Sequence, residues 1–85
     1  MAKRIVLTSH AQLRLHQRGI QENWVAAAAF APERIGPEPR HAGAERRFRA
    51  IPEFAGRILR VVCLETDGAI RIITATWDRG ARRRR

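Results

Sequence analysis

The apolar pattern at the start of the chain predicts a short strand followed by a helix. Residues 4–8 (RIVLT) are mostly β-branched or apolar, which favours a strand. Ser9 is expected to cap the helix, because Gln12 follows three residues later and completes a capping box. The helix is predicted from His10 to Arg18, and Gly19 stands where a left-handed residue ends a helix.

A second helix is predicted at about residues 21–31. Four consecutive alanines at 26–29 favour it, and Pro32 ends it. Trp24 and Phe30 lie away from its apolar face, so one of them is expected to be partly exposed. The residues on or near the apolar face, which are expected to pack on the rest of the domain, are Ile20, Val25, Ala28 and Ala29.

Four further strands are predicted, at residues 33–36, 45–51, 57–64 and 69–77. Asp67-Gly68, between the last two strands, is a strong signal for a hairpin turn. The predicted order is therefore β-α-α-β-β-β-β. This order indicates an α+β fold in which two N-terminal helices cover one face of an antiparallel sheet. The other face of the sheet is expected to be open.

The hairpin turn also predicts which side chains share a face. With a two-residue turn at Asp67-Gly68, one side of the hairpin pairs Cys63 with Ile72 and Val61 with Thr74. The other side carries two arginines and a tryptophan, and we assign it to the open face. Its predicted pairs are Leu64 with Arg71, Val62 with Ile73, Arg60 with Ala75 and Ile58 with Trp77.

Length and composition limit the class of protein. The chain has 85 residues, which suits one small domain, expected at residues 1–78. A single cysteine, Cys63, excludes an internal disulfide framework. The longest apolar run, residues 24–31, is too short for a membrane helix, and residues 1–8 lack the apolar block of a signal peptide. We therefore expect a soluble, cytoplasmic protein.

The charge indicates the kind of partner. The net charge is +9, and sixteen of the seventeen basic residues are arginine. Arginine is always charged and matches phosphate with two parallel hydrogen bonds, so nucleic acid or another polyanion is the expected partner. Residues 79–85 form a basic tail that is expected to be disordered. Removal of the four arginines at 82–85 lowers the net charge from +9 to +5, so much of the charge remains in the domain.

The first predicted helix carries a motif. His10, Arg14 and Arg18 are spaced by four residues and share a side, beside the apolar anchors Ala11 and Leu15. Residues 10–20 read HA-x-x-R-x-x-x-RGI, and the last strand ends in ITATW. Over about residues 5–78 this combination resembles domain-of-unknown-function family 4258, which is related to the RelE, ParE and BrnT toxins. The resemblance implies a RelE-like fold and an antitoxin protein as a partner.

The resemblance also implies RNA cleavage without a metal, by attack of a 2′-OH on the adjacent phosphate. That reaction needs a base, an acid and positive charge. His10 would be the base or the acid, since an imidazole exchanges protons near neutral pH, and Arg14 and Arg18 would complete the catalytic group. RNA or the ribosome would be the partner. The candidates for nucleic-acid binding are Arg47, Arg49, Arg60, Arg71 and Trp77, the last by stacking on a base.

Two alternative functions agree with the same residues. One is a non-catalytic nucleic-acid-binding or protein-interaction module on this fold, and the other is a gyrase-directed toxin of the ParE type. The absence of tyrosine favours both, because RelE-like active sites often use one. In the alternative structural interpretation, His10 bonds a carboxylate or a carbonyl, and Arg14 and Arg18 form ion pairs within the fold. No metal and no cofactor is expected, because the histidines and Cys63 show no zinc-ligand spacing.

Overall fold

A computed structural model describes residues 3–79 of the chain, and its elements follow the predicted order. The α+β fold is therefore confirmed. The strands predicted at 45–51 and 69–77 have the predicted bounds, and the other elements differ by one residue at one or both ends. In chain order the elements are β1 (Arg4–Leu7), α1 (Ser9–Arg18), α2 (Glu22–Phe30), β2 (Arg34–Pro37), β3 (Glu45–Ile51), the 3-10 turn η1 (Pro52–Phe54), β4 (Arg57–Glu65) and β5 (Ala69–Trp77).

The five strands form one sheet in the order β1-β5-β4-β3-β2. The pairs β2–β3, β3–β4 and β4–β5 are antiparallel, as predicted. β1, however, runs parallel to β5, with Arg4 opposite Ala69 and Leu7 opposite Ile72. The sheet is therefore mixed and not wholly antiparallel. The chain leaves β1 through two helices and reaches the opposite edge, so no hairpin sets the direction of β1.

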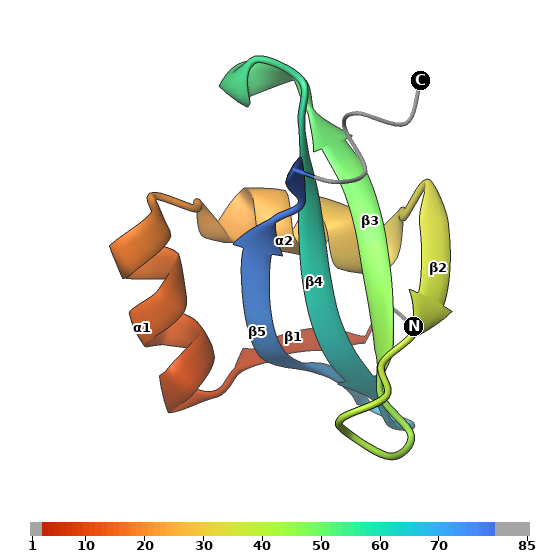
Figure 1. Cartoon of the computed structure of the whole chain (residues 1–85). Helices are drawn as coiled ribbons and strands as arrows, with labels where there is room; N and C mark the ends of the chain where they lie inside the picture. Colours follow the sequence, from red (N-terminus) through yellow and green to blue (C-terminus); the bar gives the residue numbers. More distant parts are fainter. Residues whose placement is uncertain (1–2, 80–85) are drawn as a thin grey trace.

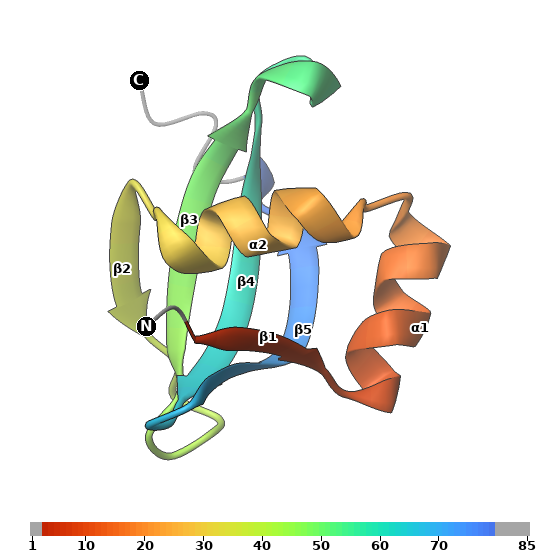
Figure 2. The same ribbon diagram turned by 180° about the vertical axis from the view of Figure 1, so that it is seen from behind.

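α2 lies across the strands on one face of the sheet, which we call the covered face (Figure 2). The opposite face, which Figure 1 presents, is the uncovered face. α1 stands beside β5, with Ala11 and Leu15 in the same core as α2. One side of α1 therefore faces the core, while its His10–Arg14–Arg18 side borders the uncovered face.

The core fills the space between the helices and the covered face. Trp24 is buried and Phe30 is 50 % exposed, so the prediction that one of these two would be partly exposed is confirmed. Cys63 is free and fully buried, and burial raises the pKa of its thiol. The buried residues of the core are Ala11, Leu15, Ile20, Trp24, Val25, Ala28, Ala29, Ile51, Leu59, Val61, Cys63, Ile70, Ile72 and Ala75.

The start of α1 differs from the prediction by one residue. Thr8, not Ser9, is the N-cap, and its Oγ1 accepts a hydrogen bond from the backbone N–H of Ala11 (3.0 Å). The same hydroxyl lies 3.1 Å from the Ile72 carbonyl, to which it can donate. The end of the helix is as predicted, because Gly19 adopts the left-handed conformation with φ 64°.

The predicted register of the β4–β5 hairpin is correct near the turn and wrong beyond the Cys63–Ile72 pair. Thr66 N–H donates to the Ala69 carbonyl (2.8 Å), and Cys63 pairs with Ile72, as predicted. A β-bulge then leaves Ile73 without a partner, so the next pair is Val62 with Thr74. A bulge shifts every later pair by one residue. Because of this shift, each residue of β5 after Ile73 lies on the face opposite to the one that we predicted.

Trp77 shows the effect of the shift. It was predicted on the open face, but it pairs with Leu59 and packs on the covered face against Trp24, at 5.8 Å between ring centroids. Its indole N–H donates to the Arg18 carbonyl (3.2 Å). The bulge therefore turns Ala75 and Trp77 toward the core and leaves Thr74 and Thr76 on the uncovered face.

Within the described residues, no helix is long and apolar enough to cross a membrane. Of the basic tail predicted at 79–85, only Arg79 belongs to the described part of the chain.

Candidate functional site

The uncovered face holds a hollow of ≈ 640 Å³, bordered by α1 on one side and by the segment between β2 and β3 on the other. We call it the basic hollow. Its walls carry cationic and imidazole side chains, and its floor is formed by β3, β4 and β5. The residues that line it are Thr8, His10, Arg14, Arg18, Glu38, Arg40, His41, Arg46, Arg60, Val62, Ile73, Thr74 and Thr76.

All three residues of the helical motif line the hollow, so they share one side of α1, as their spacing predicted. Arg14 Nε lies 3.4 Å from His10 Nε2, and Arg14 Nη1 donates to Gln17 Oε1 (2.8 Å). Arg18 Nη1 donates to the Ala75 carbonyl (2.7 Å). Arg18 thus has a structural role, because it ties α1 to β5. Arg14 holds the imidazole of His10 at the rim.

The floor of the hollow contains two arginines from neighbouring strands. Arg46 of β3 pairs with Val62, and Arg60 of β4 pairs with Phe48. Since Val62 and Arg60 are two residues apart on one face, Arg46 and Arg60 occupy diagonal positions. Residues in such positions lie roughly 7–8 Å apart, close enough for both side chains to contact one phosphate.

The segment between β2 and β3 forms the opposite wall. Glu38 is buried and accepts from the backbone N–H of Arg40 and from Arg46 Nε, both at 2.9 Å. These two hydrogen bonds lower the pKa of Glu38, the Arg40 amide being the larger cause. Glu38 therefore stays ionised and fixes both Arg46 and the turn that carries His41.

The charges in the hollow are unbalanced. Five arginines and two histidines line it, against one carboxylate, Glu38. Glu38 is engaged by Arg46, whereas the guanidinium of Arg60 has no hydrogen bond or ion pair within residues 3–79. A partly buried cation without a counter-charge is costly, so the arrangement suits an anionic ligand.

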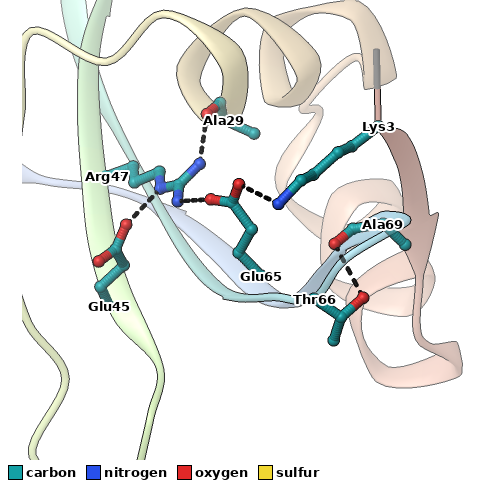
Figure 3. A network of polar contacts seen from close by, with 7 residues as sticks. All are labelled: Lys3, Ala29, Glu45, Arg47, Glu65, Thr66 and Ala69. Carbon is teal, nitrogen blue, oxygen red and sulfur yellow. Dashed lines mark hydrogen bonds and ion pairs between the residues drawn. The ribbon is translucent and has the colours of Figure 1, made fainter. Parts of the chain in front are cut away.

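Arg47 lies on the covered face, although the sequence suggested it for nucleic-acid binding. Arg47 belongs to β3, and its side chain is buried against the end of α2, where it donates to the Ala29 carbonyl (2.6 Å) (Figure 3). It also binds the carboxylates of Glu45 (2.7 Å) and Glu65. Burial opposes its charge, but the hydrogen bonds to Glu65 and Glu45 outweigh this and raise the pKa of Arg47. Its hydrogen-bonding groups are occupied within the fold.

The remaining predicted binding residues also lie outside the hollow. Arg49 donates to the Ala31 carbonyl (2.7 Å) just beyond the end of α2. Arg71 is exposed and pairs with Leu64, near the hairpin turn. Trp77 is on the covered face. Of the five residues predicted to bind nucleic acid, the structure therefore brings only Arg60 together with His10, Arg14 and Arg18.

The sequence reasoning missed one whole wall of the hollow. Glu38, Arg40 and His41 belong to a Pro- and Gly-rich loop, and Arg46 follows it at the start of β3. No spacing rule connects this loop to α1. The one signal available was the alternation along a strand, which places Arg46 and Arg47 on opposite faces but does not say which face is covered.

Comparison with known proteins gives the same family as the resemblance suggested by the motif on α1. No curated protein and no solved structure matches the chain. Within residues 3–79, no three histidine, cysteine, aspartate or glutamate side chains gather closely enough to hold a metal ion. The model of one family, described as a domain of unknown function (DUF4258), matches residues 7–77, from the end of β1 to the end of β5. The chain therefore belongs to the DUF4258 family.

Proposed function

We propose that the protein binds RNA in the basic hollow and cleaves it as RelE-like toxins do, with its own side chains as acid, base and positive charge. The observation that carries the proposal is the position of Arg60. Its guanidinium lies on the floor of the hollow without a partner in the described chain, next to four further arginines. A polyanion supplies the missing negative charge.

The rim of the hollow suits proton transfer. His10 lies on the α1 wall and His41 on the opposite wall. In the proposed reaction one imidazole accepts the proton of the 2′-OH, and the 2′ oxygen forms a bond to phosphorus. The bond from phosphorus to the 5′ oxygen breaks, and the other imidazole protonates that oxygen. The products are a 2′,3′-cyclic phosphate and a 5′-OH. Arg14, Arg46 and Arg60 would stabilise the charge of the phosphorane.

We also propose a protein partner. A relationship to RelE-like toxins implies an antitoxin, and the charge of the hollow suits a segment rich in aspartate and glutamate. Such a segment would compete with RNA for the same arginines. Co-purification of the chain with the product of an adjacent reading frame would test this proposal, and added RNA would be expected to displace the partner.

Cleavage is tested with purified protein and labelled RNA, with and without ribosomes, in EDTA. The wild-type protein should produce fragments that end in a 2′,3′-cyclic phosphate. His10→Ala should lower the rate by roughly 10²-fold or more, which is the usual contribution of a general acid or base. His16→Ala is the matched control, because His16 is exposed on α1 but does not line the hollow. Fragments formed at an unchanged rate by His10→Ala would remove His10 from the mechanism.

Binding is tested separately, by fluorescence anisotropy over a series of salt concentrations. Arg60→Ala should weaken RNA binding and reduce the slope of log K against log salt by about 0.7, the value for one phosphate contact on a single strand. Arg71→Ala removes the same charge from an exposed position outside the hollow and should change the slope far less. Equal effects of the two variants would mean that binding follows net charge and not the hollow.

The two assays together separate the alternatives. Salt-dependent binding without cleavage would leave a non-catalytic nucleic-acid-binding module. Neither binding nor cleavage of RNA would contradict the proposal, and inhibition of gyrase would then be measured for a ParE-type toxin.

A further inference from the structure

We infer that Arg34 is a stacking platform for an unpaired nucleobase, so that the hollow selects single-stranded over double-stranded RNA. The inference rests on the proposed function, because it adds a base site beside the proposed phosphate site. It is carried by an arginine–aromatic pair that lies on the uncovered face outside the hollow.

Arg34 of β2 is held over the ring of Phe48. Its guanidinium carbon lies 3.9 Å from the ring centroid, within the range of a cation–π contact. Phe48 is buried, whereas Arg34 is exposed. The ring therefore supports one side of the guanidinium and leaves the other side to solvent. The guanidinium of Arg34 makes no hydrogen bond or ion pair within the described residues, so nothing in this part of the fold uses its exposed side.

The pair is continuous with the floor of the hollow. Phe48 is the common partner of Arg34 on β2 and of Arg60 on β4, so the three residues form one row across the sheet. Neighbouring strands are about 4.8 Å apart, which places the Cα atoms of Arg34 and Arg60 roughly 10 Å from each other. A nucleotide whose phosphate contacts Arg60 can therefore extend its base toward Arg34.

The chemistry of this position suits a base more than a second phosphate. Planar guanidinium groups stack on the faces of unpaired bases in complexes with RNA. In a duplex those faces are covered by the neighbouring base pairs, so only a single strand can use the platform. The other four phenylalanine and tryptophan side chains belong to α2, η1 or the covered face, so none of them is on the uncovered face to take this role.

The experiment measures binding of three oligomers by anisotropy at one salt concentration: an intact single-stranded RNA, an abasic ribose-phosphate strand of equal length, and a duplex. The test variant is Arg34→Lys, which keeps the charge but loses the planar group. We expect Arg34→Lys to bind the intact strand about fivefold or more weakly than the wild type, the lower end of the effect of one stacked base. Binding of the abasic strand and of the duplex should be unchanged.

Arg57→Lys is the matched control. The Arg57 guanidinium carbon lies 5.3 Å from the ring centroid of Phe54 and 5.1 Å from that of Trp77, in the aromatic cluster that includes Trp24. This substitution should leave all three affinities unchanged, and thermal unfolding should show that both variants are folded. An unchanged affinity of Arg34→Lys for the intact strand, or an equal loss on all three oligomers, would overturn the inference but leave the proposed function standing. Failure of the wild-type protein to bind any of the three would overturn both.

Discussion

The carboxylate of Glu65 joins two cations that come from distant parts of the chain. It binds Lys3, at 2.6 Å, and it binds the buried Arg47 (Figure 3). The hydrogen bonds from Lys3, first, and from Arg47, second, lower the pKa of Glu65 to about 2 from its ordinary value of 4.5. The folded state therefore favours the ionised carboxylate more strongly than the unfolded chain does.

This shift makes the stability of the protein depend on pH in acid. The stabilising contribution of Glu65 is complete above about pH 4.5 and is lost as the pH falls toward 2. Glu65→Gln should therefore lower the melting temperature most at neutral pH, and the difference from the wild type should shrink between pH 4.5 and 2. Thermal unfolding followed by circular dichroism across this range measures the difference.

Lys3→Met provides the control for this prediction, because Lys3 is the larger cause of the lowered pKa. In that variant the pKa of folded Glu65 is lowered less, so the loss of stability in acid should be smaller and should be complete at a higher pH than in the wild type. A difference between the wild type and Glu65→Gln that stays constant down to pH 2 would contradict the assignment.

At the residue scale, sequence reasoning placed His10, Arg14 and Arg18 correctly on one side of a helix, because helical spacing alone decides which residues share a side. It could not separate Arg46, Arg47 and Arg49 by environment. Three arginines in one short strand look alike in sequence. Only the position of α2 shows that Arg47 caps the Ala29 carbonyl while Arg46 faces the hollow.

At the scale of elements, Thr8 connects β1, α1 and the bulge of β5. Its hydroxyl caps α1 and contacts the carbonyls of Ile72 and Ile73, at 3.1 and 3.3 Å, where the β4–β5 register shifts. A bulge needs partners for the backbone groups that leave the ladder. Thr8 supplies one, and thereby helps to set which residues of β5 face the hollow.

Thr8→Ala should therefore destabilise the protein by about 1 kcal/mol or more, the usual effect of removing an N-cap hydroxyl. Ser9→Ala is the matched control and should change the free energy of unfolding by less than about 0.5 kcal/mol, because Ser9 is exposed and does not cap the helix. Urea denaturation of the three proteins gives the values. A larger loss for Ser9→Ala than for Thr8→Ala would restore Ser9 as the cap.

Local signals predicted most of the elements. Asp67-Gly68 gave the correct two-residue turn, and Gly19 the correct end of α1. Both depend on backbone conformations that few residues adopt. The bulge at Ile73 has no such local signal, and the hydroxyl that contacts the Ile73 carbonyl belongs to Thr8, 65 residues away in the chain.

At the scale of the whole molecule, the two faces of the sheet have different roles. The covered face holds the apolar core and the Arg47 network, whereas the uncovered face holds the basic hollow. We therefore expect a substitution on the covered face to leave RNA binding unchanged, and a substitution in the hollow to leave the stability of the core unchanged.

Arg47→Met tests this division. It removes a buried donor from the Ala29 carbonyl and from two carboxylates, so we expect a destabilisation of about 1–3 kcal/mol. The affinity of the folded fraction for RNA should remain that of the wild type. Denaturation and anisotropy below the melting temperature measure the two properties. A loss of affinity in Arg47→Met beyond the unfolded fraction would show that the covered face takes part in binding.

The sequence by itself determined the α+β class, the order of the elements and the charged side of α1. Each of these follows from hydrophobic periodicity and turn chemistry within a few residues. Only the tertiary structure decided that β1 runs parallel to β5, that Trp77 and Arg47 lie on the covered face, and that the loop with His41 closes the hollow opposite His10. These features depend on packing and hydrogen bonds between segments far apart in the chain, for which no local pattern exists.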